Sequence, residues 1–178
     1  DHCHALHDVG TVNAGPDGFL ANEGLRALGL LEPIPLEDIG PAKVRATLYN
    51  MVRSVAGNCA CLCLFIPWST DEQVRLLRAA TGWDMSVHEL YKVGERALTL
   101  ARLFNAREGF GPEDDRLASR SYGPTTSGAL AEGGIDPAAL EAAMHTYYGM
   151  IGWDRETGVP TREKLEELDV AWAEAYLP

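Results

Sequence analysis

Residues 86–107, SVHELYKVGERALTLARLFNAR, are the longest helical pattern in the chain and decide its fold class. Ser86 and Glu89 have the spacing of a capping box, in which each side chain accepts a hydrogen bond from the other residue's backbone N–H. Behind this box the apolar residues keep to one helical face: Leu90, Val93, Ala97, Leu100, Ala101 and Phe104. Two glycines follow, so the pattern predicts a helix from residue 87 to about 107.

Shorter helical patterns lie on both sides of this stretch. In chain order they predict helices over residues 21–30, 42–57, 71–80, 136–149 and from Thr161 onward, the last with Leu165, Leu168 and Trp172 on its apolar face. Apart from a short extended piece at 60–66, no strand is expected, and there is neither a βαβ rhythm nor a repeat. The sequence therefore predicts an all-α, multihelical fold of about six helices.

The chain divides by composition into two parts. Glycines and prolines punctuate its beginning, which predicts a loop-rich segment over residues 1–42 and a helical region over 43–178. The chain opens on Asp1 rather than Met, in a polar phrase, so we expect it to be the tail of a longer protein.

Charge and composition exclude several classes of function. The net charge of −11 argues against nucleic acids and anionic membranes as partners, because phosphates attract basic surfaces. The longest apolar run is too short to span a membrane, and no signal peptide is visible. Four cysteines in 178 residues are not a secreted disulfide framework. We therefore expect a cytoplasmic protein with reduced cysteines.

Three of these cysteines gather in NCACLCLF, residues 58–65. A self-contained zinc or iron–sulfur site is disfavoured, because zinc ligands usually come in two separated pairs and no second pair follows. Two interpretations stay open. Cys59, Cys61 and Cys63 are small hydrophobic residues of a buried turn, or one of them ligates a cluster whose other ligands lie elsewhere.

The opening phrase DHCHALHD is a second cluster of chemically active residues. His2, His4 and His7 titrate near neutrality and can move protons or bind metals. A solvated chain end is the competing interpretation. Elsewhere, Asp114 and Asp115 are expected to face water rather than to bind a cation. The aromatic residues Tyr147, Tyr148 and Trp153 are expected in the core or at an interface.

Three phrases taken together resemble the C-terminal region of the aldehyde ferredoxin oxidoreductase family. VGERALTLARLFNAREGFGPEDDRLASR is similar to the family pattern G-E-R, L-x-R-x-F-N-x-R-x-G, D-D-x-L-P-x-R, with Ala118 at the position of its proline. YYGMIGWDRETGVPTREKLEELDV resembles the family's ending, and NCACLCLF stands where it has D-x-x-G-L-C-x-F. The resemblance covers the chain from Lys43 to its end.

The resemblance implies a tungsten or molybdenum enzyme. Two pterin dithiolenes hold the metal in this family, and a neighbouring 4Fe-4S cluster passes electrons on. The typical reaction oxidises an aldehyde to a carboxylic acid and reduces ferredoxin. The family has an N-terminal β-rich domain and two C-terminal helical domains. The chain would belong to the helical part and would be inactive alone.

The resemblance implies cofactor-binding and catalytic residues, each assigned by matching a position of this sequence to the family motif. Cys63 matches the family's last cluster ligand, and Leu62 matches a leucine whose backbone lies against the pterin. Asn58 stands where the family has a pterin-binding aspartate, and Cys61 stands where it has glycine. The resemblance also implies His2 as the catalytic histidine near the metal and His4 beside the pterin.

The two departures, Asn58 and Cys61, leave alternatives open. The chain could be a non-enzymatic helical module derived from this family, or a subunit of a related acid or acyl-thioester reductase. For the enzyme, the resemblance implies a small aldehyde or acid substrate and a ferredoxin-type electron carrier. The choice of metal, the natural substrate and homo-oligomer formation stay open.

Overall fold

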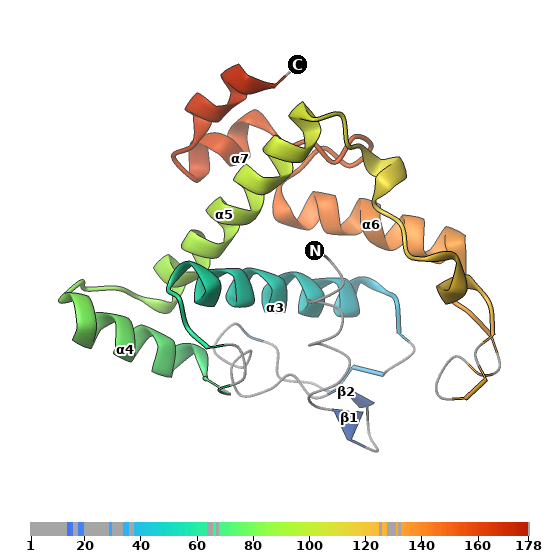
Figure 1. The fold of residues 1–178 in the computed structure, drawn as a ribbon, viewed down its shortest axis with the longest axis horizontal. Helices are drawn as coiled ribbons and strands as arrows, with labels where there is room; N and C mark the ends of the chain where they lie inside the picture. The colour runs from blue at the N-terminus through green and yellow to red at the C-terminus, as the bar shows by residue number, and fades with distance from the viewer. Residues whose placement is uncertain are drawn as a thin grey trace.

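The computed structural model describes residues 14–15, 18–19, 29, 34–35, 38–63, 66, 68–124, 126–127, 131 and 133–177. The predicted all-α class is confirmed (Figure 1). The α-helices are α3 (Pro41–Cys59), α4 (Thr70–Thr81), α5 (Val87–Arg107), α6 (Pro137–Ile151) and α7 (Arg162–Glu167). The 3-10 helices are η1 (Pro112–Asp114), η2 (Ser119–Tyr122) and η3 (Ala171–Tyr176). Strands β1 (Ala14–Gly15) and β2 (Gly18–Phe19) form one antiparallel pair.

The helix boundaries follow from caps that are visible in the sequence. Ser69 and Ser86 each form a capping box at the start of α4 and α5. The Asp136 side chain accepts a hydrogen bond from the backbone N–H of Ala138 at the start of α6, with proline at the first helical position. The expected helices 42–57, 71–80, 87–107 and 136–149 are confirmed to within two residues. The expected helix over 21–30 lies outside the described residues except for Gly29, a turn residue with φ of 83°.

Helix α3 is the element against which the others are arranged. Figure 1 shows α5 crossing over one end of α3, while α6 lies along the other half of α3. Helix α4 packs against α5 at the same end, and η3 packs against both α5 and α7. The C-terminal end of α3 therefore lies close to α4 and to the beginning of α5.

The crossing of α3 and α5 depends on one glycine. A Cβ atom placed on Gly94 would stand 2.1 Å from the carbonyl oxygen of Val52 and 2.9 Å from the Cγ1 of the same residue. Both residues are buried, Val52 completely. Only a residue without a Cβ allows the two backbones to approach this closely.

The buried apolar residues form three clusters. One joins α3 to α6 and the following turn: Leu48, Val52, Tyr148, Ile151 and Trp153. A second lies between α3, α4 and α5: Ala56, Val74 and Leu90. The third packs the C-terminal segment on α5: Leu103, Leu165, Leu168, Val170 and Ala173. The expectation that the aromatic residues at 147, 148 and 153 belong to the core is confirmed.

The buried face of α5 differs from the predicted apolar stripe. Phe104 is 55% exposed, whereas Glu95, Thr99 and Arg102 are at most 5% exposed. The stripe was misplaced because α5 buries polar groups against the C-terminal segment. Each of the two buried charges has its own partners, Glu95 in α7 and Arg102 at Asp115 and Gly158.

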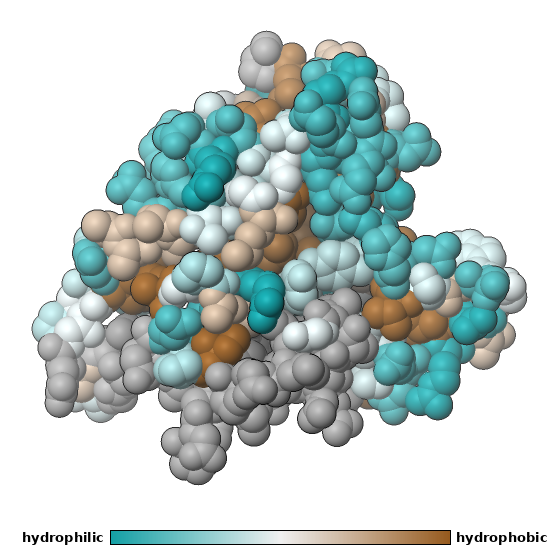
Figure 2. All heavy atoms as spheres, turned by 180° about the vertical axis from the view of Figure 1, so that it is seen from behind, coloured by the Kyte–Doolittle hydropathy of each residue, from teal (hydrophilic) through white to brown (hydrophobic). Residues whose placement is uncertain are grey.

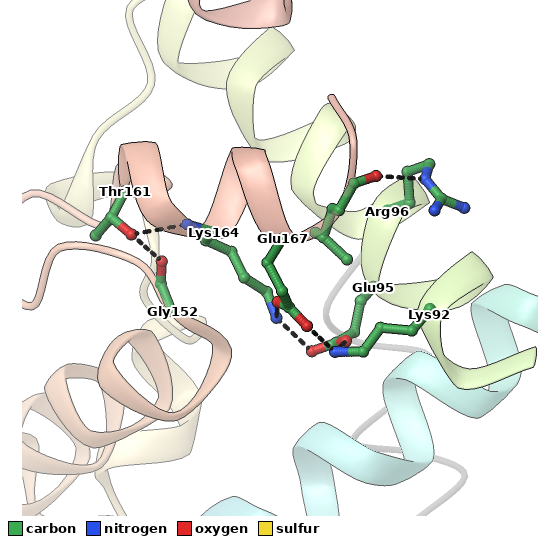
Figure 3. A network of polar contacts seen from close by, with 8 residues as sticks. Lys92, Glu95, Arg96, Gly152, Thr161, Lys164 and Glu167 are labelled. Carbon is green, nitrogen blue, oxygen red and sulfur yellow. Dashed lines mark hydrogen bonds and ion pairs between the residues drawn. The ribbon is translucent and has the colours of Figure 1, made fainter. Parts of the chain in front are cut away.

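Glu95 is the centre of the first buried charge network (Figure 3). Its carboxylate accepts hydrogen bonds from Lys92 at 2.5 Å and from Lys164 of α7 at 2.8 Å. Glu167 bonds the same two lysines, so negative and positive groups alternate around a ring. Burial alone would raise the pKa of Glu167, but the hydrogen bonds from Lys164 and Lys92 outweigh it and lower that pKa. Arg96 also donates its Nε–H to the carbonyl oxygen of Leu168, at 2.8 Å.

Arg102 is the centre of the second network. Its guanidinium pairs with Asp115 at 2.6 Å, and its Nε–H donates to the carbonyl oxygen of Gly158 at 2.9 Å. Tyr148 donates its hydroxyl to the same Asp115 carboxylate, and burial followed by this bond raises the pKa of Tyr148. The expectation that Asp115 faces water is wrong, because the carboxylate neutralises a buried arginine.

The C-terminal helix is shorter than predicted. Helix α7 ends at Glu167, and Asp169 adopts a left-handed φ of 57° before the chain continues as η3. Leu165 and Leu168 are fully buried as expected, but Trp172 is 63% exposed. The expectation that Trp172 belongs to the apolar face of one continuous helix is wrong, because the turn at Asp169 reorients the chain.

The surface is mixed in character. Figure 2 shows a rear face that is mainly hydrophilic in its upper part, with hydrophobic residues reaching the surface lower down beside the grey residues. No helix among the described residues combines the length and the apolar character needed to cross a membrane.

The close crossing predicts the effect of Gly94→Ala. The added methyl group collides with the backbone of α3, so the free energy of unfolding should fall by about 1–3 kcal/mol, measured by urea unfolding. Gly57→Ala is the matched control within α3, since its new Cβ has no neighbour nearer than 4.0 Å. That change should raise stability slightly, through helix propensity. Equal effects of both substitutions would contradict this account of the crossing.

Candidate functional site

The candidate site begins at the C-terminal end of α3. The helix closes in a Schellman motif: the backbone N–H of Leu62 donates to the carbonyl of Gly57, and that of Cys61 donates to Asn58, both at 3.0 Å. Cys61 occupies the left-handed position of the motif, with φ of 56°. The motif reverses the chain and turns Leu62 and Cys63 back toward the end of the helix.

Cys61 is an unusual residue at such a position. Helices α4, α5 and α6 end with glycine in the left-handed conformation, at Gly82, Gly109 and Gly152. Helix α7 uses Asp169, and aspartate tolerates this conformation better than most residues. A cysteine carries the steric cost of its Cβ there. The glycine that the family resemblance implies at this position is the residue that the backbone favours.

The expected extended piece at 60–66 is wrong for the residues that the structure describes there. Cys59 is the last residue of α3, Cys61 lies in the turn, and Cys63 follows without regular structure. The helix continues past Gly57 to Cys59, and the carbonyls of Gly57 and Asn58 accept the hydrogen bonds of the Schellman motif. All three cysteines are free and exposed, so the interpretation of a buried cysteine turn is also wrong.

A small hollow of about 30 Å³ lies between the end of α3 and the start of α4. Its lining residues come from both elements and from the loop between them: Arg53, Ser54, Gly57, Asn58, Leu62, Cys63, Ile66, Trp68 and Gln73. Arg53 reaches across it and donates from Nη1 to the carbonyl of Trp68 at 3.5 Å. The hollow therefore combines a cation, two amides and a thiol with apolar walls.

Gln73 and Trp68, which both line the hollow, each carry a buried polar atom without a hydrogen-bond partner among the described residues. The atoms are Oε1 of Gln73, a side chain only 5% exposed, and Nε1 of Trp68. Buried polar atoms are nearly always hydrogen-bonded in folded proteins, so each such exception needs an explanation. One buried acceptor and one buried donor thus belong to residues that line the same hollow as Asn58 and Cys63.

The sequence-predicted site residues fall into two groups. Asn58, Leu62 and Cys63 line the same hollow, although they come from a helix end and a loop. His2 and His4 lie outside the described residues. In the described part of the chain, no three side chains of His, Cys, Asp or Glu lie close enough together to hold a metal ion.

Sequence reasoning missed Arg53, Trp68 and Gln73. Only Gln73 left a signal. It shares one face of α4 with Thr70 and Val74, both buried, so a polar side chain occupies an apolar position of the helical repeat. Nothing in the sequence marks Arg53 or Trp68 as lining this hollow.

Comparison with known proteins identifies the family. Residues 8–170 match the family model of aldehyde ferredoxin oxidoreductase, domains 2 and 3. The chain belongs to this family, within its C-terminal helical domains.

Two relatives support the assignment. The chain is 33% identical over 137 residues to the tungsten-containing aldehyde ferredoxin oxidoreductase of Thermococcus kodakarensis, covering 75% of this chain and 22% of that protein. It is 31% identical over 137 residues to the enzyme of the same name from Pyrococcus furiosus, with the same coverage. The chain thus spans about a fifth of the length of these relatives.

A solved structure shares the fold. It is the active-site complex BamBC of benzoyl coenzyme A reductase in complex with 1,5-dienoyl-CoA. The TM-score is 0.58 at 20% identity, and the match covers 98% of this chain and 26% of that chain.

The exposed residues at the end of α3 fit part of the cofactor set that the family implies. Cys63 offers an exposed sulfur, a soft ligand suited to an iron–sulfur cluster. Asn58 offers an exposed amide, and Leu62 follows in the turn. These donor types are compatible with a pterin beside a cluster, whereas the hollow itself, at about 30 Å³, is too small for a ring system.

The left-handed conformation at residue 61 yields a stability prediction. Cys61→Gly should raise the free energy of unfolding by about 1 kcal/mol, because glycine adopts this φ without a Cβ clash. The same change at Cys59, which is the last residue of α3, should lower it through lost helix propensity. Thermal or urea unfolding distinguishes them, and a loss of stability in both variants would contradict the strain assigned to Cys61.

Proposed function

We propose that this chain forms the C-terminal helical part of a tungstopterin or molybdopterin oxidoreductase that oxidises aldehydes to carboxylic acids. Water supplies the second oxygen of the acid, and two electrons and two protons leave. The electrons pass through a 4Fe-4S cluster to a ferredoxin-type carrier. The observation that carries the proposal is the Schellman turn at the end of α3, which presents the exposed Cys63 in the same lining as Asn58 and Leu62.

Each residue has a stated part in this proposal. Cys63 would hold one iron of the cluster through its thiolate, with the other ligands supplied from outside the described residues. The amide of Asn58 and the backbone of Leu62 would contact the pterin, which would supply the dithiolene sulfurs for the metal. His2 would take or give the proton at the substrate, and His4 would assist in binding the pterin. The whole protein is placed in the cytoplasm, in line with its free cysteines.

Two other functions are alternatives that the tests would distinguish from the proposed one. A subunit of an acid or acyl-thioester reductase is the second candidate, since the solved structure with the same fold is a benzoyl coenzyme A reductase complex. That likeness concerns the fold, whereas the more similar relatives are named for aldehydes. A non-enzymatic helical module is the third, suggested by Asn58 and Cys61 at family positions for aspartate and glycine.

The test of the proposal is the substitution Cys63→Ala in the intact protein that carries this chain. Loss of one thiolate ligand should remove most of the cluster's roughly four irons and abolish electron transfer to ferredoxin. Iron is measured by elemental analysis and the cluster by its visible absorption. Cys59→Ala is the matched control, because Cys59 is an exposed thiol of the same segment outside the implied ligand position.

Unchanged iron in the Cys63→Ala protein would refute Cys63 as a ligand. Equal iron loss in both variants would mean that the segment needs its cysteines for folding rather than for the cluster.

A further inference from the structure

A hydrophobic groove, called the α5–η3 groove below, lies between the last turns of α5 and the helix η3. Its buried lining residues include Leu103 and Ala173, which belong to the apolar cluster between α5 and the C-terminal segment. Its exposed lining residues include Phe104, Trp172 and Tyr176. The groove measures about 140 Å³. An apolar cluster of the fold therefore continues to the surface here.

The three aromatic side chains of the groove are held in place but not buried. Phe104, Trp172 and Tyr176 are 55%, 63% and 60% exposed. Trp172 and Tyr176 pack edge to face with their ring centroids 6.2 Å apart, and the guanidinium of Arg107 lies 4.7 Å from the ring of Phe104. Apolar side chains gathered in one exposed patch mark a surface that contacts another molecule or segment.

The sequence pattern also assigns this surface to the interior. Phe104 and Trp172 lie at the apolar positions of the helical repeats in residues 86–107 and 161–172, and such positions are buried in most helices of globular proteins. The described fold leaves both exposed. A groove that is covered in the intact protein reconciles the pattern with the exposure.

The size of the groove indicates what covers it. Its lining is seven residues, whereas a stable interface between two separate proteins has about 20–30 residues on each side. A contact this small suffices when both surfaces belong to one polypeptide, because the tether removes most of the entropic cost of association. The matched relatives offer such a polypeptide, since this chain spans only 22% of their length.

We propose that the α5–η3 groove is the docking surface for a segment of the same polypeptide that lies outside these 178 residues. The proposal rests on the proposed function, in which this chain is the C-terminal part of a longer oxidoreductase. Arg107 lines the groove but pairs with Glu108 at 2.7 Å, so the recognition is apolar. A hollow of about this size accepts a benzene ring, and the segment therefore inserts one aromatic or large aliphatic side chain.

The experiment is hydroxyl-radical footprinting of the intact protein, with the oxidation of each tryptophan read by mass spectrometry. Trp83, between α4 and α5, is the matched reference because it is 63% exposed, as Trp172 is. Trp172 should be oxidised several-fold more slowly than Trp83 in the native protein and at the same rate as Trp83 in urea. The protection should be the same throughout a dilution series in which size-exclusion chromatography shows a monomer.

Two variants test the contact itself. Trp172→Glu places a charge in the covered groove, so the oxidation of Phe104 and Tyr176 should rise several-fold in the intact protein. Trp83→Glu is the control and should leave the oxidation of both residues unchanged. Both substituted side chains are mainly exposed in the described fold, so neither change disturbs its buried clusters.

The outcomes separate this inference from the proposed function. Protection of Trp172 in the monomer supports the inference. Oxidation of Trp172 as fast as that of Trp83 overturns it, and protection that appears only when the protein associates overturns it in favour of a second copy. The footprint needs no cofactor. An open groove in a protein that contains tungsten or molybdenum and iron therefore overturns the inference alone, while a protected groove without these metals supports it and contradicts the proposed function.

Discussion

The contact between Gly94 of α5 and the carbonyl of Val52 in α3 is the constraint on which the rest of the structure depends. It brings two helix backbones closer than any side chain would allow. With this crossing fixed, Leu90 of α5 joins Ala56 of α3 and Val74 of α4 in one buried cluster, and α4 packs against α5. The hollow lies where the end of α3 and the start of α4 come together around this cluster.

The second organising principle is the way α5 buries charge. Glu95 and Arg102 lie on its inner face, and each is neutralised by residues from a later part of the chain or across the fold. Such pairs contribute little net stability when compared with apolar residues, but removing one partner leaves a costly unpaired charge. They fix the position of α7 and of the turn at Gly158 relative to α5. These pairs therefore hold the C-terminal segment at one position along α5. The same helix crosses α3 and so also helps to position the candidate site.

Local sequence signals predicted most of the helices correctly. They did not predict the contacts between residues that are distant in the sequence. The caps at Ser86 and Asp136 lie next to the groups that they bond, so the sequence alone locates them. The pairing of Arg102 with Asp115 joins distant residues, and the exposed Phe104 and Trp172 follow from packing that no periodicity reveals. Gln73 could have been noticed, because a long polar side chain on the buried face of a helix is a local signal.

Three of the predicted site residues, Asn58, Leu62 and Cys63, line one hollow. Their roles remain predictions, as do those of His2 and His4. The Schellman turn explains in physical terms why the family pattern favours glycine before the leucine and the cysteine. A cysteine at that position retains the turn at some cost in strain.

The most direct test of the account is the elemental composition and visible absorption of the intact, natively purified protein that carries this chain. The account predicts tungsten or molybdenum bound in stoichiometric amount, about four irons and a broad cluster absorption. A protein with neither metal nor iron would contradict the cofactor-binding role assigned to the end of α3, while its place in the family would stand.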